Sequence, residues 1–205
     1  MIEITNASFI TSAPNVKLAP PNECQNEVVF MARSNTGKSS LLNSLTKRKS
    51  LAKVSATPGK TRLINYFDVT FLDRDTDEKQ QALFVDLPGF GYAKVSKSIK
   101  SDWEKNLTDY ISQRAQIKLF IHLVDARHTD LEIDRSVSEF LEQICTEDQV
   151  ILRVFTKIDK LNQKELNALR VKFPGSLMVS NLKKRGIDKL VNTIHGIVFG
   201  SSDDD

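Results

Sequence analysis

The chain has few of the features that mark secreted or membrane proteins. Its two cysteines, Cys24 and Cys145, stand far apart and lack the spacing of a zinc site or a disulfide framework. It contains no run of eighteen apolar residues, and its first twenty residues have no basic start followed by an apolar stretch. We therefore expect a cytoplasmic protein without membrane attachment.

Strong charge bias and repetition are also missing. The 29 Lys and Arg residues exceed the 26 Asp and Glu residues by a net charge of +3, which is too small to indicate a nucleic-acid binder by itself. No internal repeat or Pro-rich or Gly/Ser-rich linker divides the 205 residues. The sequence contains no Ser-His-Asp arrangement and no paired-carboxylate site. These observations predict a single domain over residues 1–200 and a disordered acidic tail at 201–205.

Short apolar runs alternate with segments of helical periodicity, which is typical of an α/β protein with a mostly parallel sheet. The polar stretch at 73–80 is too short for a crossover helix, so the strands on either side of it are expected to be antiparallel. We predict three layers, with helices on both faces of a six-stranded, mostly parallel sheet that has one antiparallel edge strand. The expected strands include 28–30, 62–72, 81–86, 117–124, 149–155 and 177–179, and the expected helices are 39–47, 98–114, 131–144, 162–171 and 187–198.

A phosphate-binding motif lies between the first of these strands and the first helix. Residues 32–39 read ARSNTGKS and match GxxxxGK[ST], except that Ala32 replaces the first glycine. The backbone N–H groups of such a loop and the start of the following helix form an anion site, and Gly37 permits a close approach. Lys38 would face the β- and γ-phosphates, and the Ser39 hydroxyl would complete the coordination of Mg²⁺. Because alanine tolerates a positive φ poorly, we expect strain or a slight reshaping of the loop at Ala32, and some loss of nucleotide affinity.

An acidic motif, DLPG at 86–89, follows the third predicted strand. Asp86 would lie at the carboxyl end of that strand, where open α/β sheets bind ligands. We expect Asp86 to hold Mg²⁺ through a water beside Ser39, and the Gly89 N–H to sense the γ-phosphate. Phe90 stands where many GTP-hydrolysing switches carry a glutamine that orients the attacking water. The prediction is slow intrinsic hydrolysis, accelerated by a partner, a monovalent cation or a backbone-held water.

A candidate base-reading motif, TKID at 156–159, follows the fifth predicted strand and resembles the [NT]KxD sequence of guanine-specific pockets. The two oxygens of Asp159 can accept from the ring N–H and the exocyclic amino group of guanine, whereas adenine offers no such pair of donors. Asp159 therefore disfavours an ATPase. Lys157 would stack its stem over the ring and tie back to the phosphate loop. Residues 179–181 occupy the place of a weaker motif that contacts the guanine carbonyl, with an ordinary strand-to-loop Ser180 as the alternative.

Four motifs, ARSNTGKS, TPGKT at 57–61, DLPG and TKID, stand in the order typical of P-loop GTPases, within the three-layer P-loop NTPase fold. The stretch DLPGFGYAK at 86–94, together with TPGKT, resembles the EngB family of ribosome-biogenesis GTP-binding proteins, and the resemblance covers nearly the whole chain. It implies GTP binding with slow hydrolysis, Mg²⁺ as cofactor, and a role in assembling the large ribosomal subunit during bacterial growth and division.

The resemblance also assigns roles by position. Thr61 looks like the switch threonine that reaches Mg²⁺ when the γ-phosphate is present, with Thr57 as the alternative, and Asn35 matches an asparagine that coordinates K⁺ in related GTPases. The implied catalytic residues are Lys38, Thr61 and Gly89, and the implied metal-binding residues are Ser39, Thr61 and Asp86. The implied nucleotide-binding residues are Arg33, Ser34, Asn35, Thr36, Gly37, Lys38, Ser39, Ser40, Pro58, Gly59, Lys60, Thr61, Asp86, Leu87, Pro88, Gly89, Thr156, Lys157, Asp159, Val179, Ser180 and Asn181.

Three basic clusters are candidate contacts for ribosomal RNA, although charge runs commonly only solvate a surface. They comprise Lys47, Arg48 and Lys49; Lys94, Lys97 and Lys100; and Lys183, Lys184 and Arg185. The leading hypothesis is a monomeric GTPase that binds the large ribosomal subunit or its precursor, through rRNA and ribosomal proteins, in one nucleotide state and leaves it in the other. The alternative is a guanine-nucleotide sensor that does not turn over appreciably and has a non-ribosomal partner.

Overall fold

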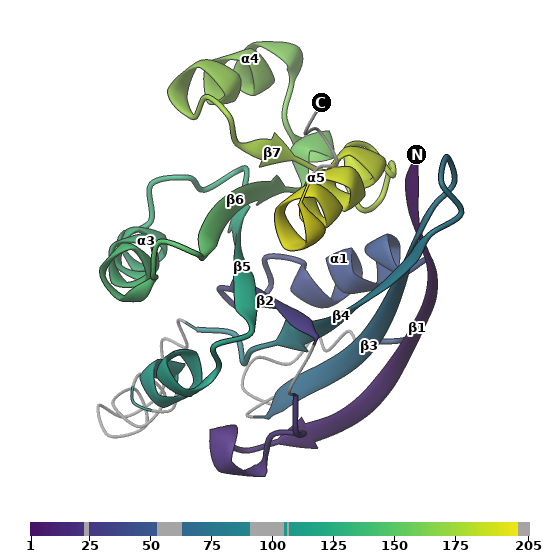
Figure 1. Ribbon diagram of the computed structural model, residues 1–205. Helices are drawn as coiled ribbons and strands as arrows, with labels where there is room; N and C mark the ends of the chain where they lie inside the picture. Colours follow the sequence, from purple (N-terminus) through teal and green to yellow (C-terminus); the bar gives the residue numbers. More distant parts are fainter. Residues whose placement is uncertain (23–24, 53–62, 91–104, 106, 201–205) are drawn as a thin grey trace.

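The computed structural model describes residues 1–22, 25–52, 63–90, 105 and 107–200 (Figure 1). Its strands are β1 (Ile2–Ala13), β2 (Asn26–Ala32), β3 (Ile64–Asp73), β4 (Lys79–Asp86), β5 (Ile117–Asp125), β6 (Val150–Thr156) and β7 (Leu177–Met178). Its helices are α1 (Lys38–Leu45), α3 (Glu132–Ile144), α4 (Gln163–Lys172) and α5 (Ile187–Phe199), and residues 107–113 are also helical. Short 3₁₀ turns lie at Val16–Leu18 and Ile158–Lys160. The predicted acidic tail, 201–205, lies outside the described residues.

The strands form one sheet in the order β1-β3-β4-β2-β5-β6-β7. Strand β2 pairs in parallel with β4 and β5, and the parallel pairing continues through β6 to β7. Strand β3 is antiparallel to both of its neighbours, β1 and β4. The predicted α/β class and the antiparallel pairing of β3 with β4 are confirmed. The sheet, however, has seven strands among the described residues where six were predicted. The antiparallel strand β3 also lies one place in from the edge, which β1 occupies.

Strand β1 escaped prediction because its side chains do not alternate regularly between core and solvent. Only Ile4, Ala7 and Ala13 are buried among its twelve residues. The register with β3 shifts between Ile4 and Asn6 and again between Phe9 and Thr11. Each shift breaks the two-residue period by which a half-buried strand is identified in a sequence.

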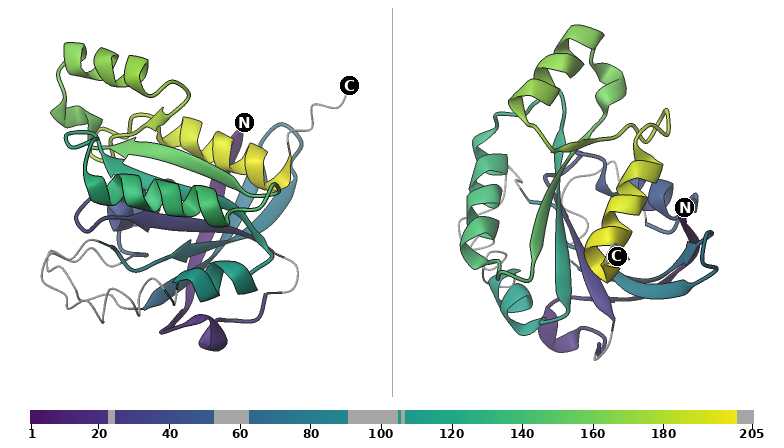
Figure 2. Two further views of the ribbon diagram at one scale, coloured as in Figure 1. Left: turned by 90° about the vertical axis from the view of Figure 1, so that its left-hand side faces the viewer. Right: turned by 45° about the horizontal axis from the view of Figure 1, so that its top comes forward.

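The central strands are buried on both faces, as their continuous apolar runs predicted. Val28 and Phe30 of β2 pack with α1 and α5, whereas Val29 and Met31 pack with the 107–113 helix and α3. Helix α4 packs Leu166 against a smaller cluster over the ends of β5 and β6. Figure 2 shows the central strands between these helical layers. Each fully buried large apolar side chain contributes about 1.5–3 kcal/mol, so both layers stabilise the strand that leads into the phosphate loop.

Among the described helices, none is long and apolar enough to span a membrane. Because β2, β4, β5 and β6 run in parallel, the loops that follow them emerge at the same edge of the sheet. The predicted phosphate, acidic and base-reading motifs are three of these loops. The sheet therefore brings together motifs that are separated by more than a hundred residues in the sequence.

Candidate functional site

The phosphate loop takes its unusual backbone conformations at Asn35 and Gly37. Their φ angles are 65° and 105°, and Gly37 is the N-cap residue of α1. Ala32, in contrast, ends strand β2, is fully buried and is not among the residues with positive φ. The predicted strain at Ala32 is therefore wrong, because the left-handed positions come later in the loop, where a glycine takes one of them.

Three successive carbonyls of the phosphate loop accept hydrogen bonds from side chains of the base-reading loops. The pairs are Lys157 Nζ with Asn35, Thr156 Oγ1 with Thr36 at 2.7 Å, and Asn181 Nδ2 with Gly37 at 3.3 Å. The C=O and N–H of a planar trans peptide point in opposite directions, so the N–H groups of Gly37 and Lys38 point away from these side chains. The first-turn N–H groups of α1 have no partner within the helix. An anion on that side would meet several donors.

The start of the phosphate loop is tied to the acidic motif. The Phe90 N–H donates to the Ala32 carbonyl at 3.1 Å, and the Ser34 N–H donates to the Phe90 carbonyl at 3.2 Å. A Cβ atom on Gly89 would lie 3.2 Å from Ser34 Oγ, a tighter approach than most side chains tolerate. A side chain at position 89 would therefore require Ser34 to shift, because the two loops lie so close together.

The predicted phosphate-facing lysine and the predicted metal-facing carboxylate form an ion pair. Lys38 Nζ contacts Asp86 Oδ1 and donates to the Leu87 carbonyl at 2.7 Å. The other oxygen, Asp86 Oδ2, accepts from Asn65 Nδ2 at 3.2 Å. The Lys38 and Asp86 side chains are only 12% and 6% exposed, so their charges are largely removed from water.

These residues fit the donor chemistry of Mg²⁺, which binds one or two protein oxygens and keeps several waters. Asp86 already accommodates a cationic group at Oδ1, and the partly exposed Ser39 offers a hydroxyl in the first turn of α1. Residues Pro58, Gly59, Lys60 and Thr61, together with Thr57, lie outside the described residues, as do Lys94, Lys97 and Lys100.

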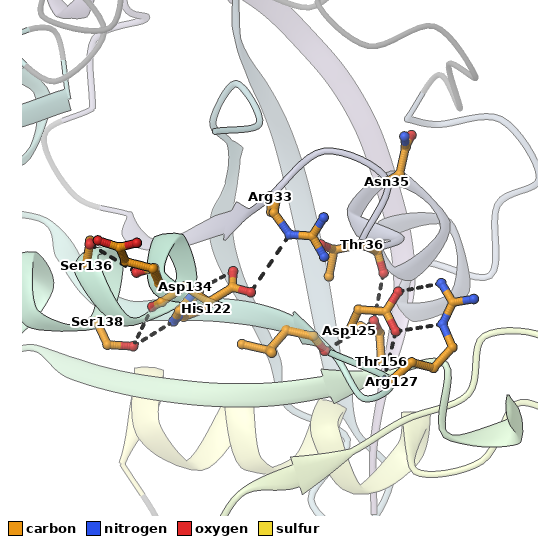
Figure 3. Close-up of polar contacts among 12 residues, drawn as sticks. Arg33, Asn35, Thr36, His122, Asp125, Arg127, Asp134, Ser136, Ser138 and Thr156 are labelled. Atoms are coloured by element: carbon orange, nitrogen blue, oxygen red, sulfur yellow. Dashed lines mark hydrogen bonds and ion pairs between the residues drawn. The ribbon is translucent and has the colours of Figure 1, made fainter. Parts of the chain in front are cut away.

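Asp125 at the end of β5 was missed by the sequence analysis. It accepts from Arg127 Nε at 2.9 Å and from Arg127 Nη2 at 2.7 Å (Figure 3). It also accepts from Lys157 Nζ at 2.9 Å. Burial alone would raise the pKa of Asp125, but the bonds from Arg127 and Lys157 outweigh it and hold that pKa well below its ordinary value. Asp125 therefore stays ionised and holds the Lys157 ammonium beside the phosphate loop. The rule that identified Asp86, a carboxylate ending a buried strand, applies equally here.

The predicted base-reading carboxylate is held by the loop after β7. Ser180 Oγ donates to Asp159 Oδ1 at 2.6 Å and accepts from the Lys183 N–H at 3.0 Å. Ser180 is fully buried, and its backbone pairs with that of Arg185. Val179 lies just beyond β7, although it was predicted to belong to that strand, and its N–H still donates to the Phe155 carbonyl at 2.8 Å. Ser180 thus orients the side chain of Asp159.

Arg33, which was expected at the nucleotide, directs its side chain toward α3 (Figure 3). Its Nε lies 3.8 Å from Asp134 Oδ2, and His122 Nε2 lies 3.8 Å from Asp134 Oδ1. Ser138 Oγ is 3.2 Å from His122 Nδ1 and accepts from Arg153. Arg33 therefore provides a charged contact between the phosphate loop and α3.

Sequence comparison identifies the family. Residues 27–157 match the family described as 50S ribosome-binding GTPase. The EngB protein of Aliarcobacter butzleri, named a probable GTP-binding protein, is 53% identical over 97% of this chain and 99% of its own. The chain belongs to the EngB family. An EngB protein of Campylobacter jejuni is 54% identical over 96% of this chain and 98% of its own. The protein is thus a GTP-binding protein of a ribosome-associated GTPase family.

Solved structures agree on the fold. A crystal structure of a probable GTP-binding protein EngB superposes with a TM-score of 0.61 at 24% identity, covering 84% of this chain and 98% of that one. Era of Aquifex aeolicus bound to GDP and AlF₄⁻ superposes with a TM-score of 0.63 at 22% identity, covering 85% of this chain and 57% of that one. Another Era structure, in complex with MgGDPNP and part of 16S ribosomal RNA, has a TM-score of 0.60 at 23% identity and covers 86% of this chain and 57% of that one. At these identities the structures support the GTPase fold of EngB proteins and nothing finer.

Proposed function

We propose that the protein is a slow GTPase that acts as a nucleotide-controlled switch in the assembly of the large ribosomal subunit, with residues 1–200 forming one GTP-binding domain. The observation that carries the proposal is the contact of the base-reading loops with three successive carbonyls of the phosphate loop. Because these loops are already in contact, one guanine nucleotide could bind the phosphate loop and the base-reading loops without a prior rearrangement of either. We further propose that the protein acts in the cytoplasm as a monomer, and that loss of this assembly step impairs growth and septation.

Within this proposal, each residue has a separate task. The N–H groups of Gly37 and Lys38 receive the phosphates, and the Lys38 ammonium exchanges Asp86 Oδ1 for the β- and γ-phosphate oxygens. Asp159, oriented by Ser180, accepts from the two donors of guanine. Mg²⁺, when bound, supplies positive charge that neutralises the phosphates; Ser39 and Thr61 would hold it directly, and Asp86 would hold it through a water.

Slow turnover follows from Phe90. Its side chain is 4% exposed, and its ring centroid lies 6.0 Å from that of His122. A buried hydrocarbon ring cannot align a water for attack on the γ-phosphate, so an outside group must supply this function. The rival proposal is a nucleotide sensor that does not turn over. Multiple-turnover hydrolysis measured with ribosomal subunits present separates the two, because only the GTPase switch releases phosphate continuously.

We expect K⁺ to be such an outside group. Asn35 is exposed, has a φ of 65°, and its carbonyl is held by Lys157. A monovalent cation beside the Asn35 amide oxygen would add positive charge next to the transferring phosphoryl group. Single-turnover hydrolysis should be about tenfold faster in KCl than in NaCl, which corresponds to about 1.4 kcal/mol of activation free energy. Asn35→Ala should abolish the difference. Equal rates in the two salts would discard this role.

The proposed binding to the large ribosomal subunit is tested by pelleting. The protein, loaded with GDP or a non-hydrolysable GTP analogue, is pelleted with separated ribosomal subunits across a KCl series. We expect analogue-dependent capture on the large subunit that weakens steeply with salt, because each RNA phosphate contact releases counterions. Capture that does not depend on salt would favour a protein contact. Absence of capture in both states, with nucleotide binding confirmed, would leave a non-ribosomal partner.

The structure distinguishes two of the candidate basic surfaces. Lys47 and Arg48 contact Glu3 and Asn6 of β1, which favours a structural role for that cluster. No ion pair engages Lys183, Lys184 or Arg185 in the part of the chain that the structure describes, and all three are exposed in the loop that also positions Asp159. We therefore expect substitution of residues 183–185 by Ala to weaken pelleting more than substitution of 47–49.

A further inference from the structure

A polar row crosses the sheet beside the proposed metal carboxylate. Ser12 of β1 lies opposite Asn65 of β3, and Asn65 lies opposite Asp86 of β4. Ser12 Oγ donates to Asn65 Oδ1 at 2.6 Å, and Asn65 Nδ2 donates to Asp86 Oδ2 at 3.2 Å. The row thus runs from the edge strand to the carboxylate that contacts Lys38.

The geometry points to Asn65 as a positioning residue for the Mg²⁺-holding carboxylate of Asp86, with Ser12 fixing the orientation of the Asn65 amide. This inference rests on the proposed function, since it takes Asp86 as the metal-facing residue. An amide group has one accepting and one donating end, so a hydroxyl proton given to Oδ1 commits Nδ2 to the opposite side. Asp86 lies on that side.

The row matters most when Lys38 leaves Asp86. In the described arrangement, Lys38 holds Oδ1 and Asn65 holds Oδ2. Once the phosphates attract the Lys38 ammonium, the bond from Asn65 is the contact that keeps Oδ1 directed at the site Lys38 has vacated. Groups that orient a metal site from outside its direct ligands typically affect metal affinity by 10- to 100-fold. Asn65 would therefore tune Mg²⁺ affinity without touching the metal or the nucleotide.

The position of Asn65 in the chain strengthens this role. It follows Thr61, the proposed switch ligand, by four residues, and Ile64 begins β3. The strand that carries the polar row is thus the continuation of the switch segment. Through its hydrogen bond to Asn65, Ser12 links β1 to Asp86. The edge strand thus contributes to the geometry of the site.

The test compares Asn65→Ala, Ser12→Ala and Asp86→Ala with a control, Thr70→Ala, which lies on β3 away from the row. The dissociation constant of a fluorescent GDP is measured across a Mg²⁺ titration that starts in EDTA. We expect Asn65→Ala to raise the Mg²⁺ midpoint by about tenfold and Ser12→Ala to raise it by a smaller factor, while neither changes GDP affinity in EDTA. Because Asn65 acts through its bond to Asp86, adding Asn65→Ala to Asp86→Ala should change nothing further.

The possible outcomes distinguish the proposed metal site at Asp86 from the positioning role of Asn65. If Asp86→Ala keeps the wild-type Mg²⁺ dependence, the proposed metal site is wrong. If Asp86→Ala loses that dependence while Asn65→Ala and Ser12→Ala keep the wild-type midpoint, the positioning role alone is wrong. An equal loss of GDP affinity with and without Mg²⁺ in the Asn65 variant would show a general structural role and overturn the inference. Ser12→Ala, a milder change, provides the same readout if Asn65→Ala does not fold.

Discussion

Replacing Asp159 by asparagine is expected to weaken GDP binding by about 10²- to 10⁴-fold. The carboxylate offers two acceptors to the two donors of guanine, whereas an amide offers one acceptor and an NH₂ group that opposes a guanine donor. Hydrogen bonds to charged groups contribute about 1.5–3 kcal/mol each. The variant loses one of the two bonds and removes the charge that strengthens the other, so GDP binding weakens by about 3–6 kcal/mol. The guanine donor that faces the new NH₂ group also loses its bound water without gaining an acceptor, which weakens GDP binding further.

The same variant should gain affinity for xanthine nucleotides, which carry a carbonyl where guanine has its exocyclic amino group. Ser180 Oγ lies 2.6 Å from Asp159 Oδ1 and could still donate to the amide oxygen, which would leave the new NH₂ group toward the base. Calorimetric titration with GDP and XDP measures both changes. Asp188→Asn, an exposed change on α5, is the matched control. Unchanged GDP affinity in a folded Asp159→Asn protein would remove Asp159 from the base site.

Replacing Glu27 by alanine is expected to lower the free energy of unfolding by about 3–5 kcal/mol. Glu27 is fully buried in β2. Its Oε1 accepts from Arg114 and from Asn22 at 2.8 Å, and its Oε2 accepts from the Tyr110 hydroxyl at 2.8 Å. Truncation would leave the guanidinium of Arg114 buried without its counter-charge. For a chain of this size, the loss corresponds to a melting temperature lower by about 6–20 °C.

A double variant separates charge from packing. Glu27→Leu combined with Arg114→Met removes both charges and keeps most of the volume, so it should recover much of the stability that Glu27→Ala loses. Urea unfolding followed by circular dichroism measures all three proteins. A loss below about 1 kcal/mol in Glu27→Ala would contradict the argument, because it would mean that water reaches the Arg114 guanidinium. Since Tyr110 lies within the 107–113 helix and Arg114 follows its last residue, the cluster also anchors that helix to the strand that leads into the phosphate loop.

The parallel core was predictable because its strands are buried on both faces. Val28 to Met31 is a continuous apolar run, and Ile117 to Val124 is interrupted only by Lys118 and His122. The phosphate motif at 32–39 was also predictable, because all the residues that it requires are adjacent in the sequence. Asp125 could have been found by the rule that found Asp86.

Ser12 and Asn65 could not have been predicted. They meet through the register of β1 with β3, and that register contains shifts which no local pattern reveals. The conformation of Ala32 was misjudged because the motif alone does not say which residues of the loop turn left-handed. The structure assigns that conformation to Asn35 and Gly37.

The irregular register of β1 has a consequence for how the molecules behave in a crowded solution. Among the described strands, β1 forms one border of the sheet, and Phe9 and Ile10 are 52% and 44% exposed on it. A long, straight border with such side chains would be a template for cross-β stacking between molecules. Such interruptions generally bend and twist a strand, so we expect that a second chain would not pair with β1 along its full length. The irregularity that made this strand hard to predict is thus expected to oppose aggregation as well.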